Sequence, residues 1–245
     1  MQLSIFDTLY PQFKIENPIR LIELFAGYGS QAMALERLGV PFEHYRVVEF
    51  DKYAIASYNA IHGTNFPPMD ICKTTADDLA IVDTYIHTYI LTYSFPCTDI
   101  SQAGLLLGMA ENSNTRSSLL WQVKRLLAET KEKPQVLLME NVPNIQSDAN
   151  LPHLQKWISF LNSLGYKSYY KVLNSCDFGV AQHRERFFCI SILGDYSYVF
   201  PETMDLRYCA RDYFENLTEE QALQQVVKQP KAYDLLVKLN EKGQL

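Results

Sequence analysis

The segment Ile19-Arg20-Leu21-Ile22-Glu23-Leu24-Phe25-Ala26-Gly27-Tyr28-Gly29-Ser30 decides the fold of this 245-residue chain. Its first half is a mostly apolar, β-rich run, which predicts a strand over Ile19–Phe25. The two glycines that follow allow a tight turn, and a helix-like segment continues from Gln31 to Leu38. A strand, a glycine turn and a helix in this order are typical of the first unit of an α/β sheet.

The same alternation of apolar runs and helix-like segments continues along the chain. The further expected strands are Tyr45–Glu49, Tyr89–Tyr93, Val136–Met139 and a closing pair, Tyr166–Leu173 and Phe187–Leu193. The further expected helices are Lys52–Ile61, Leu119–Thr130 and Leu154–Leu164. This order predicts an α/β fold with a doubly wound, mostly parallel sheet and helices on both faces.

Length and composition fit a globular protein with one sizeable core. Hydrophobic residues make up 47% of the chain, charged residues 20%, and the net charge is −6. Autonomous nucleic-acid-binding domains are usually basic, so this acidity disfavours such a domain. It is compatible with a catalytic domain that touches nucleic acid through a few local cations. From about Asp205 the pattern changes to charged, helix-like segments, Glu219–Lys228 and Lys231–Leu239, which Pro230 separates.

The cysteine pattern disfavours both zinc and disulfides. The five cysteines are odd in number, widely spaced and form no CxxC pair, so we expect no metal and a reducing cytoplasm. No apolar run approaches the roughly 20 residues of a membrane span, and the N-terminus lacks a signal-peptide pattern. The cysteines are Cys72, Cys97, Cys176, Cys189 and Cys209.

Cys97 is the first candidate for chemistry, because it ends the segment Ser94-Phe95-Pro96-Cys97 directly after a predicted buried strand. Proline fixes its own φ and favours extended geometry before it, so the strand stops there. In open α/β sheets, ligands bind at this carboxyl edge of the strands. A lone cysteine is also compatible with a small buried core residue.

The glycine turn lacks the complete dinucleotide-binding pattern. Gly27 and Gly29 permit close approach of a ligand to the backbone, but Ala32 stands where that pattern has its third glycine. A plain strand-to-helix turn is the alternative.

Two residues at the end of the second expected strand, and one after the short run Pro68-Met69, complete a possible adenosine site. Glu49 follows Gly29 by about 20 residues, the spacing of an acid that accepts ribose hydroxyls. Phe50 offers a ring to stack on adenine, and Asp70 is placed to reach its exocyclic amine. An adenosine site without a pyrophosphate cradle favours S-adenosylmethionine over NAD.

Two polar clusters follow the later apolar runs. Glu140 stands at the end of an expected strand, where it either binds the edge of a base or caps the next helix. Arg184 and Arg186 share one face of an extended segment, where they converge on a pocket or form a solvated charge run.

These elements together resemble the cytosine-C5 DNA methyltransferases of bacteria and phages, from about residue 19 to 193. The motifs that carry the resemblance are Phe25-Ala26-Gly27-Tyr28-Gly29, Glu49-Phe50-Asp51, Asp70-Ile71, Pro96-Cys97 with Ser101 and Gly104, Thr115-Arg116-Ser117-Ser118-Leu119, Glu140-Asn141-Val142 and Gln182-His183-Arg184-Glu185-Arg186. They occur in the family's order and at its spacing. The resemblance implies the methyltransferase form of the Rossmann-like fold.

The resemblance also implies an activity and its residues. Methyl would pass from S-adenosylmethionine to C5 of a cytosine flipped out of double-stranded DNA, through a Cys97 adduct, as in restriction-modification. Residues implied as catalytic are Cys97, Glu140, Arg184 and Arg186. Those implied for the cofactor are Phe25, Ala26, Gly27, Gly29, Ser30, Glu49, Phe50, Asp70, Ile71 and Pro96. Those implied for the substrate and the mobile loop are Ser101, Gly104, Asn141, Val142 and Gln182.

The sequence departs from the family in two places. Thr98 and Ile100 replace the more frequent glutamine and phenylalanine. After Leu193 we find neither a target-recognition domain nor the last family motif. We therefore expect a catalytic domain at 1–200 and a helical tail at 201–245. The alternatives are one subunit of a split enzyme with a second protein, a truncated form, a cofactor-binding module without activity, and a tRNA cytosine-C5 methyltransferase.

Overall fold

A single six-stranded sheet organises the described part of the chain. The computed structural model describes residues 11–100, 108–111, 113, 115–213, 215–224, 234, 237–239 and 241. The strands are β1 (Ile19–Leu24), β2 (Phe42–Val48), β3 (Thr88–Tyr93), β4 (Val136–Asn141), β5 (Tyr166–Asn174) and β6 (Glu185–Leu193). Their order in the sheet is β2-β1-β3-β4-β6-β5. The pairs among β1 to β4 are parallel, and β6 runs antiparallel to both β4 and β5.

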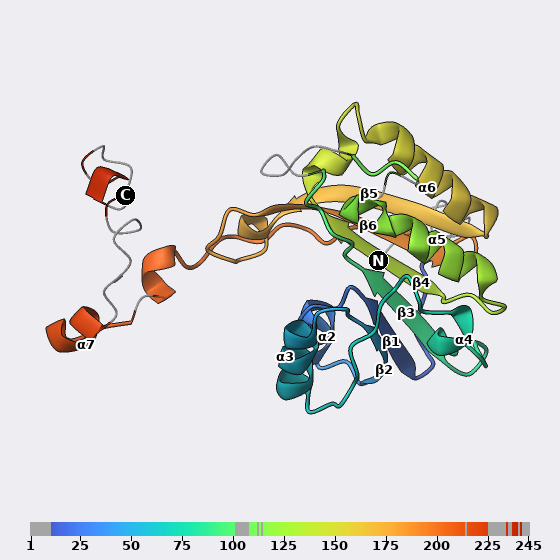
Figure 1. The fold of residues 1–245 in the computed structure, drawn as a ribbon, viewed down its shortest axis with the longest axis horizontal. Helices are drawn as coiled ribbons and strands as arrows, with labels where there is room; N and C mark the ends of the chain where they lie inside the picture. Colours follow the sequence, from blue (N-terminus) through green and yellow to red (C-terminus); the bar gives the residue numbers. More distant parts are fainter. Residues whose placement is uncertain are drawn as a thin grey trace, which may run out of the picture.

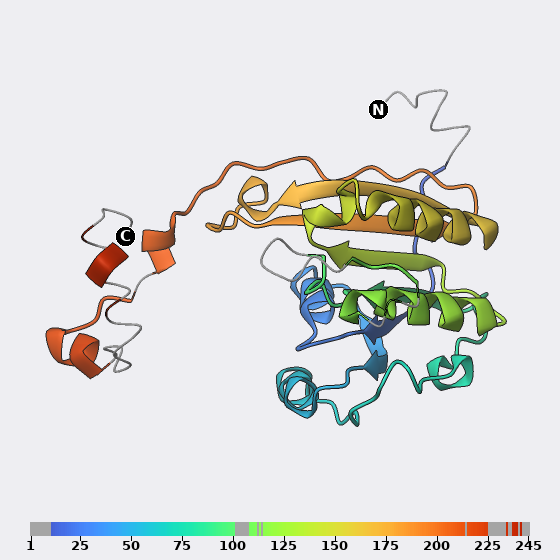
Figure 2. The same cartoon turned by 45° about the horizontal axis from the view of Figure 1, so that its top comes forward.

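The α-helices of the described residues are α2 (Ser30–Arg37), α3 (Lys52–His62), α4 (Ala76–Leu79), α5 (Leu120–Glu129), α6 (Leu151–Ser163) and α7 (Glu219–Gln224). Four of these helices, α2, α3, α5 and α6, lie in two groups against this sheet (Figure 1). Both views place α2 and α3 together beside β1 and β2, and α5 and α6 side by side across β4 and β6 (Figures 1 and 2). This arrangement confirms the predicted α/β fold with a mostly parallel sheet.

The core lies mainly between the sheet and α5 and α6. Helix α5 buries one side, formed by Leu120, Trp121, Val123, Leu126 and Leu127. These residues meet buried strand residues such as Leu91 and Met139, and Trp157 of α6 joins the same cluster. A helix with apolar residues on one face buries that face against a sheet, which accounts for the position of α5.

Most predicted elements are confirmed, but two bounds change the position of functional residues. Strand β4 continues beyond Met139, so Glu140 lies inside the strand and not after it. Strand β6 begins before Phe187, so Arg186 also lies within a strand. The physical reason is their pairing, because Glu140 lies opposite Phe188 in the antiparallel ladder. Backbone hydrogen bonds between strands extend each strand past its apolar run.

The sequence analysis missed helix α4, which is one turn long. Its first residues hold it by a reciprocal cap, in which the Thr75 side chain accepts from Asp78 N and the Asp78 carboxylate accepts from Thr75 N. The signal was present, since a threonine followed three residues later by an acid is a capping pattern.

After β6 the chain runs back along the sheet as far as Met204, which bridges to Phe178, and farther on α7 lies apart from the sheet in both views (Figures 1 and 2). Helix α7 covers the first part of the predicted helix Glu219–Lys228. Most of the predicted segment Lys231–Leu239 lies outside the described residues. The division into a catalytic domain and a helical tail stays a prediction. No helix in the described ranges has the length and apolar character that crossing a membrane requires.

Candidate functional site

The sheet order brings the predicted site residues to one edge. The parallel strands β1 to β4 end there at Leu24, Val48, Tyr93 and Asn141. Because β6 is antiparallel, it begins at this same edge, beside the end of β5, where Asn174 lies opposite Glu185. The glycine turn, the Pro96-Cys97 segment, Glu140 and the two arginines therefore come to one end of the sheet.

The glycine turn after β1 has a left-handed backbone at three positions. Phe25, Gly27 and Gly29 have φ values of 57°, 57° and 85°. A Cβ added at Gly27 would meet no atom within 4 Å, so the turn faces open space at this point. A Cβ at Gly29 would lie 2.4 Å from His62 Nε2, so close packing with α3 requires glycine there.

Glu49 is held against the glycine turn by two backbone donors. Gly27 N donates to Glu49 Oε2 over 2.9 Å, and Asp51 N donates to Glu49 Oε1 over 2.8 Å. A carboxylate has about four acceptor positions, so further positions remain for a ligand's hydroxyl groups. The adjacent Phe50 side chain is 75% exposed and offers an uncovered ring.

Asp70 is tied to the Glu49 segment through the backbone. Met69 N donates to Glu49 O over 2.8 Å, and Asp70 Oδ1 accepts from Cys72 N over 2.9 Å. Ile71, by contrast, is only 5% exposed and belongs to the core. The side chain of Ile71 is therefore a packing residue, and only its backbone remains for contact with a ligand.

The Pro96-Cys97 segment is anchored from two directions. The buried Asn141 side chain donates to Phe95 O over 3.0 Å and accepts from Val142 N over 2.8 Å. From the other side, Ser117 Oγ donates to Pro96 O over 2.7 Å. Cys97 is half-buried and has a free thiol. The end of β4 thus fixes the backbone that presents this thiol.

Two of the other cysteines, Cys189 and Cys72, are less suited to act as nucleophiles, because a thiolate is the reactive form. Burial raises the pKa of Cys189 to about 12. Burial and the nearby Asp70 carboxylate raise the pKa of Cys72. Both thiols are therefore held in the unreactive protonated form.

Glu140 and Arg186 form an ion pair across neighbouring strands. Arg186 Nε lies 3.0 Å from Glu140 Oε1, and the two side chains are 24% and 23% exposed. The sequence analysis predicted each residue separately but not their contact. The pair fixes one oxygen of the carboxylate, and the carboxylate has further positions that can accept a hydrogen bond.

The rest of the segment Gln182–Arg186 is more exposed. Asn174 at the end of β5 holds its backbone, since Asn174 Oδ1 accepts from Arg184 N over 3.1 Å. The side chains of Gln182 and Arg184 are both exposed. Ser175 Oγ donates to the Gln182 carbonyl. The structure therefore holds Gln182 through its backbone carbonyl, while its side chain is exposed. Ser101 and Gly104 lie outside the described residues.

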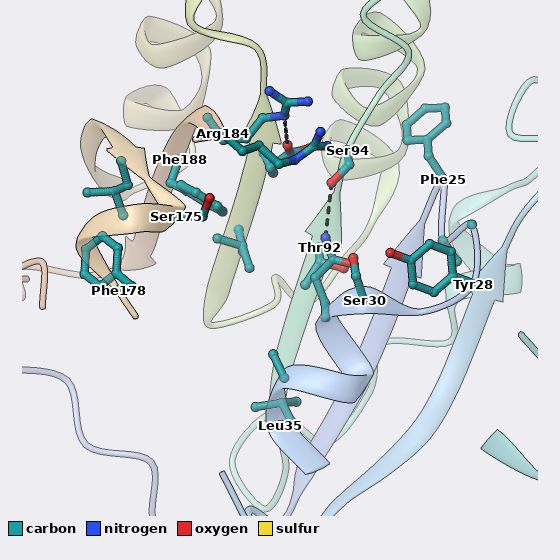
Figure 3. A pocket seen from close by; sticks show the side chains of 18 of the residues that line it. Phe25, Tyr28, Ser30, Leu35, Thr92, Ser94, Ser175, Phe178, Arg184 and Phe188 are labelled. Carbon is teal, nitrogen blue, oxygen red and sulfur yellow. Dashed lines mark hydrogen bonds and ion pairs between the residues drawn. The ribbon is translucent and has the colours of Figure 1, made fainter. Parts of the chain in front are cut away.

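A cavity of about 770 Å³ joins the glycine turn to the Glu140–Arg186 pair (Figure 3). Predicted site residues that line it are Phe25, Ala26, Gly27, Ser30, Glu140, Arg184 and Arg186. Cys97, Glu49, Phe50, Asp70 and Gln182 are not among its lining residues. The sequence analysis missed Tyr28, Gln31 and Ser94 as lining residues. Gln31 Nε2 donates to Ser94 Oγ over 3.2 Å, which ties α2 to the end of β3 (Figure 3).

Comparison with known proteins identifies the family. Residues 19–243 match the family model described as C-5 cytosine-specific DNA methylase. The chain belongs to this family. The type II methyltransferase M2.ScrFI of Lactococcus lactis subsp. cremoris is 33% identical over 82% of this chain and 69% of its own length. The orphan methyltransferase M.SssI of Spiroplasma monobiae is 33% identical over 75% and 62%.

A third relative, the type II methyltransferase M.HhaI of Haemophilus parahaemolyticus, is 34% identical over 79% of this chain and 56% of its own length. The chain thus spans about half to two thirds of the length of the relatives it matches.

Solved structures confirm the methyltransferase fold. The Entamoeba histolytica methyltransferase EhMeth superposes with a TM-score of 0.66 at 15% identity, over 84% of this chain and 62% of that chain. The S. pombe Dnmt2 methyltransferase superposes with a TM-score of 0.59 at 20% identity, over 75% and 52%. The predicted Rossmann-like fold of this family is therefore confirmed.

Proposed function

We propose that this chain carries the catalytic centre for methyl transfer to C5 of cytosine in double-stranded DNA. The observation that carries the proposal is that the end of β4 positions both the candidate nucleophile, Cys97, and the candidate base-binding acid, Glu140. Glu140 is paired with Arg186, and the next residue, Asn141, holds the carbonyl two residues before Cys97. A rigid link of this kind keeps two reacting groups in register.

The chemistry of cytosine explains these residue types. Its C5 is a poor nucleophile, and addition of the soft Cys97 thiolate to C6 makes the ring enamine-like. Glu140 hydrogen-bonds the N3 and 4-amino edge and stabilises the charge that develops on addition. Once C5 carries the methyl group, loss of the C5 proton to a base lets the thiolate leave. Arg186 holds Glu140 in position, and the exposed Arg184 assists in placing the base.

The residues around the glycine turn fit S-adenosylmethionine. Glu49 has acceptor positions for ribose hydroxyls, Phe50 has an uncovered ring for adenine, and Gly27 borders open space. When bound, this cofactor supplies an electrophilic methyl group on its sulfonium. The chain's own part is to hold the nucleoside end at Glu49 and to keep the methyl donor beside the Glu140 edge.

The cofactor assignment is tested by Glu49→Ala, with binding measured by calorimetry. We expect a loss of about 1–3 kcal/mol, the scale of hydrogen bonds to a charged group. Glu43→Ala is the matched control, because Glu43 lies on the preceding strand β2 and its ion pair is with Arg20 at the surface. If the Glu49 variant and the parent chain bind the cofactor with equal affinity, Glu49 does not bind the ribose.

The activity is tested by transfer of labelled methyl from S-adenosylmethionine to mixed-sequence duplex DNA. Cys97→Ser should abolish transfer and keep cofactor binding, while the control Cys209→Ser, in an exposed segment, should keep both. Loss of cofactor binding together with transfer in Cys97→Ser would contradict the assigned role. If the parent chain binds cofactor without transfer, a second polypeptide with target-recognition residues becomes the next component to add.

A further inference from the structure

A cluster of two histidines and one glutamate lies behind the glycine turn, and none of its members lines the Glu140 cavity. It combines Glu36 of α2, His44 of β2 and His62 of α3. Glu36 Oε1 lies 2.9 Å from His62 Nδ1 and 3.7 Å from His44 Nε2, and the three donor atoms all lie within 4.8 Å of one another. Neither the family motifs nor the proposed reaction uses these residues.

In each histidine, the ring nitrogen that does not face Glu36, here called the outer nitrogen, already contacts a protein oxygen. His62 Nε2 lies 3.0 Å from the Tyr28 carbonyl, which only accepts, so this nitrogen carries a proton. His44 Nδ1 lies 2.7 Å from Tyr58 Oη, whose own proton goes to Glu23 Oε2 over 2.6 Å. The hydrogen between His44 and Tyr58 therefore comes from His44 Nδ1.

These outer contacts leave the two inner nitrogens as lone-pair donors. In the neutral form of each ring, His44 Nε2 and His62 Nδ1 have no proton and both face the Glu36 carboxylate. Lone pairs and a carboxylate that converge in this way repel one another unless a proton or a metal cation lies between them. An imidazole whose second nitrogen donates to a carbonyl or hydroxyl is the usual arrangement of a metal-ligating histidine.

We propose that Glu36, His44 and His62 bind one divalent transition-metal ion, with Zn²⁺ as the best fit. Nitrogen and oxygen ligands lie about 2.0–2.1 Å from zinc, so neighbouring ligand atoms of a tetrahedral site are about 3.3 Å apart. The two Glu36 separations, 2.9 and 3.7 Å, lie on either side of this value. The third separation, between the two histidine nitrogens, is within 4.8 Å, so the side chains would draw together around the ion.

Burial around the cluster supports a defined site with one open side. The His62 side chain has no exposed surface and that of His44 is 18% exposed, whereas Glu36 is 45% exposed. The Phe42 ring packs on His44 at a centroid distance of 4.7 Å. An ion would enter past Glu36 and keep a water as its fourth ligand. No local spacing reveals this site, because its ligands come from three separate elements.

The test is a titration of the metal-free chain with Co²⁺ and then Zn²⁺, followed by visible absorption. Cobalt bound to nitrogen and oxygen gives ligand-field bands without the thiolate charge transfer of a cysteine site. We expect one ion per chain. Glu36→Gln and His44→Gln should each weaken binding about 100-fold or more, because loss of an outer partner alone costs about 10–100-fold.

The matched control is His153→Gln, which removes a half-buried histidine at the start of α6 and should leave the affinity unchanged. Circular dichroism of each variant shows whether its fold is intact, and Glu36→Gln, at an exposed position, provides the result if His44→Gln does not fold. The proposal is overturned if the parent chain binds no ion, if the bound cobalt shows thiolate bands, or if Glu36→Gln binds as tightly as the control.

Discussion

Arg186 Nε lies 3.0 Å from Glu140 Oε1, and this ion pair joins two antiparallel neighbours, β6 and β4, at the edge of the sheet where the candidate site lies. Both side chains are about three-quarters covered, so water screens the pair only in part. The carboxylate is therefore fixed in direction where it lines the cavity in which a base would bind.

Replacement of Arg186 by glutamine should slow methyl transfer more than it weakens cofactor binding. The guanidinium holds Glu140 in place, and a displacement of about 1 Å at a reacting group can cost about 100-fold in rate. Single-turnover transfer and cofactor calorimetry on the same preparation separate the two effects. If both quantities change equally, Arg186 acts on the cofactor site and not through Glu140.

Asn141 should be needed for stability as well as for activity. Its buried side chain donates to Phe95 O and accepts from Val142 N. Asn141→Ala leaves both backbone groups without partners, at a cost of about 1–3 kcal/mol. Urea denaturation measures this loss, and Asn162→Ala, at an exposed position of α6, serves as the control. Equal midpoints for the two variants would show that Asn141 does not anchor the Cys97 segment.

The two glycines of the turn should respond differently to alanine. Gly29→Ala places a methyl group 2.4 Å from His62 Nε2 and 2.6 Å from Tyr58 Cε2, at a positive φ. Backbone strain and overpacking together predict a loss of about 2–4 kcal/mol in the free energy of unfolding.

Gly27→Ala meets no atom within 4 Å, so only backbone strain of about 1–2 kcal/mol is expected. Its methyl group enters the space proposed for the cofactor, and cofactor affinity should fall. Unfolding curves and calorimetry of both variants give the comparison. A Gly27→Ala chain that binds cofactor normally would place the ligand elsewhere.

Glu111 should make a pH-dependent contribution to stability. Hydrogen bonds from Lys156 and Lys124 lower the pKa of Glu111 from its ordinary value of 4.5. The carboxylate form is favoured in the folded chain, so the stabilisation is complete above pH 4.5 and is lost as the pH falls through the lowered folded pKa.

For this partly exposed group we expect Glu111→Gln to cost about 0.5–1 kcal/mol at pH 7, roughly 1–4 °C in Tm. The difference between variant and parent should shrink as the pH falls through the lowered pKa of Glu111 and vanish once the carboxylate is protonated in the folded chain. Thermal unfolding at pH 7 and at a series of acid pH values measures it. A difference that persists in acid would show that packing, and not charge, accounts for the effect.

Local sequence patterns predicted the strands and the edge where the site lies, because apolar runs and glycine turns are local signals. They also predicted Cys97, Glu140 and Arg186 one by one. They did not predict the Glu140–Arg186 pair, which depends on β6 inserting between β4 and β5 in the sheet. The same limit applies to Asn141 and Phe95, whose contact is set by the pairing of β3 with β4.

The most direct test of the central claim is a covalent trap on duplex DNA in which the target cytosine carries fluorine at C5. After methyl transfer, the ring has no C5 proton to lose, so the attacking thiolate cannot leave and the adduct persists. The account predicts a cofactor-dependent adduct whose mass maps to the peptide containing Cys97 and which Cys97→Ser does not form. Methyl transfer to ordinary cytosine with no adduct at Cys97, or an adduct at another cysteine, would contradict it.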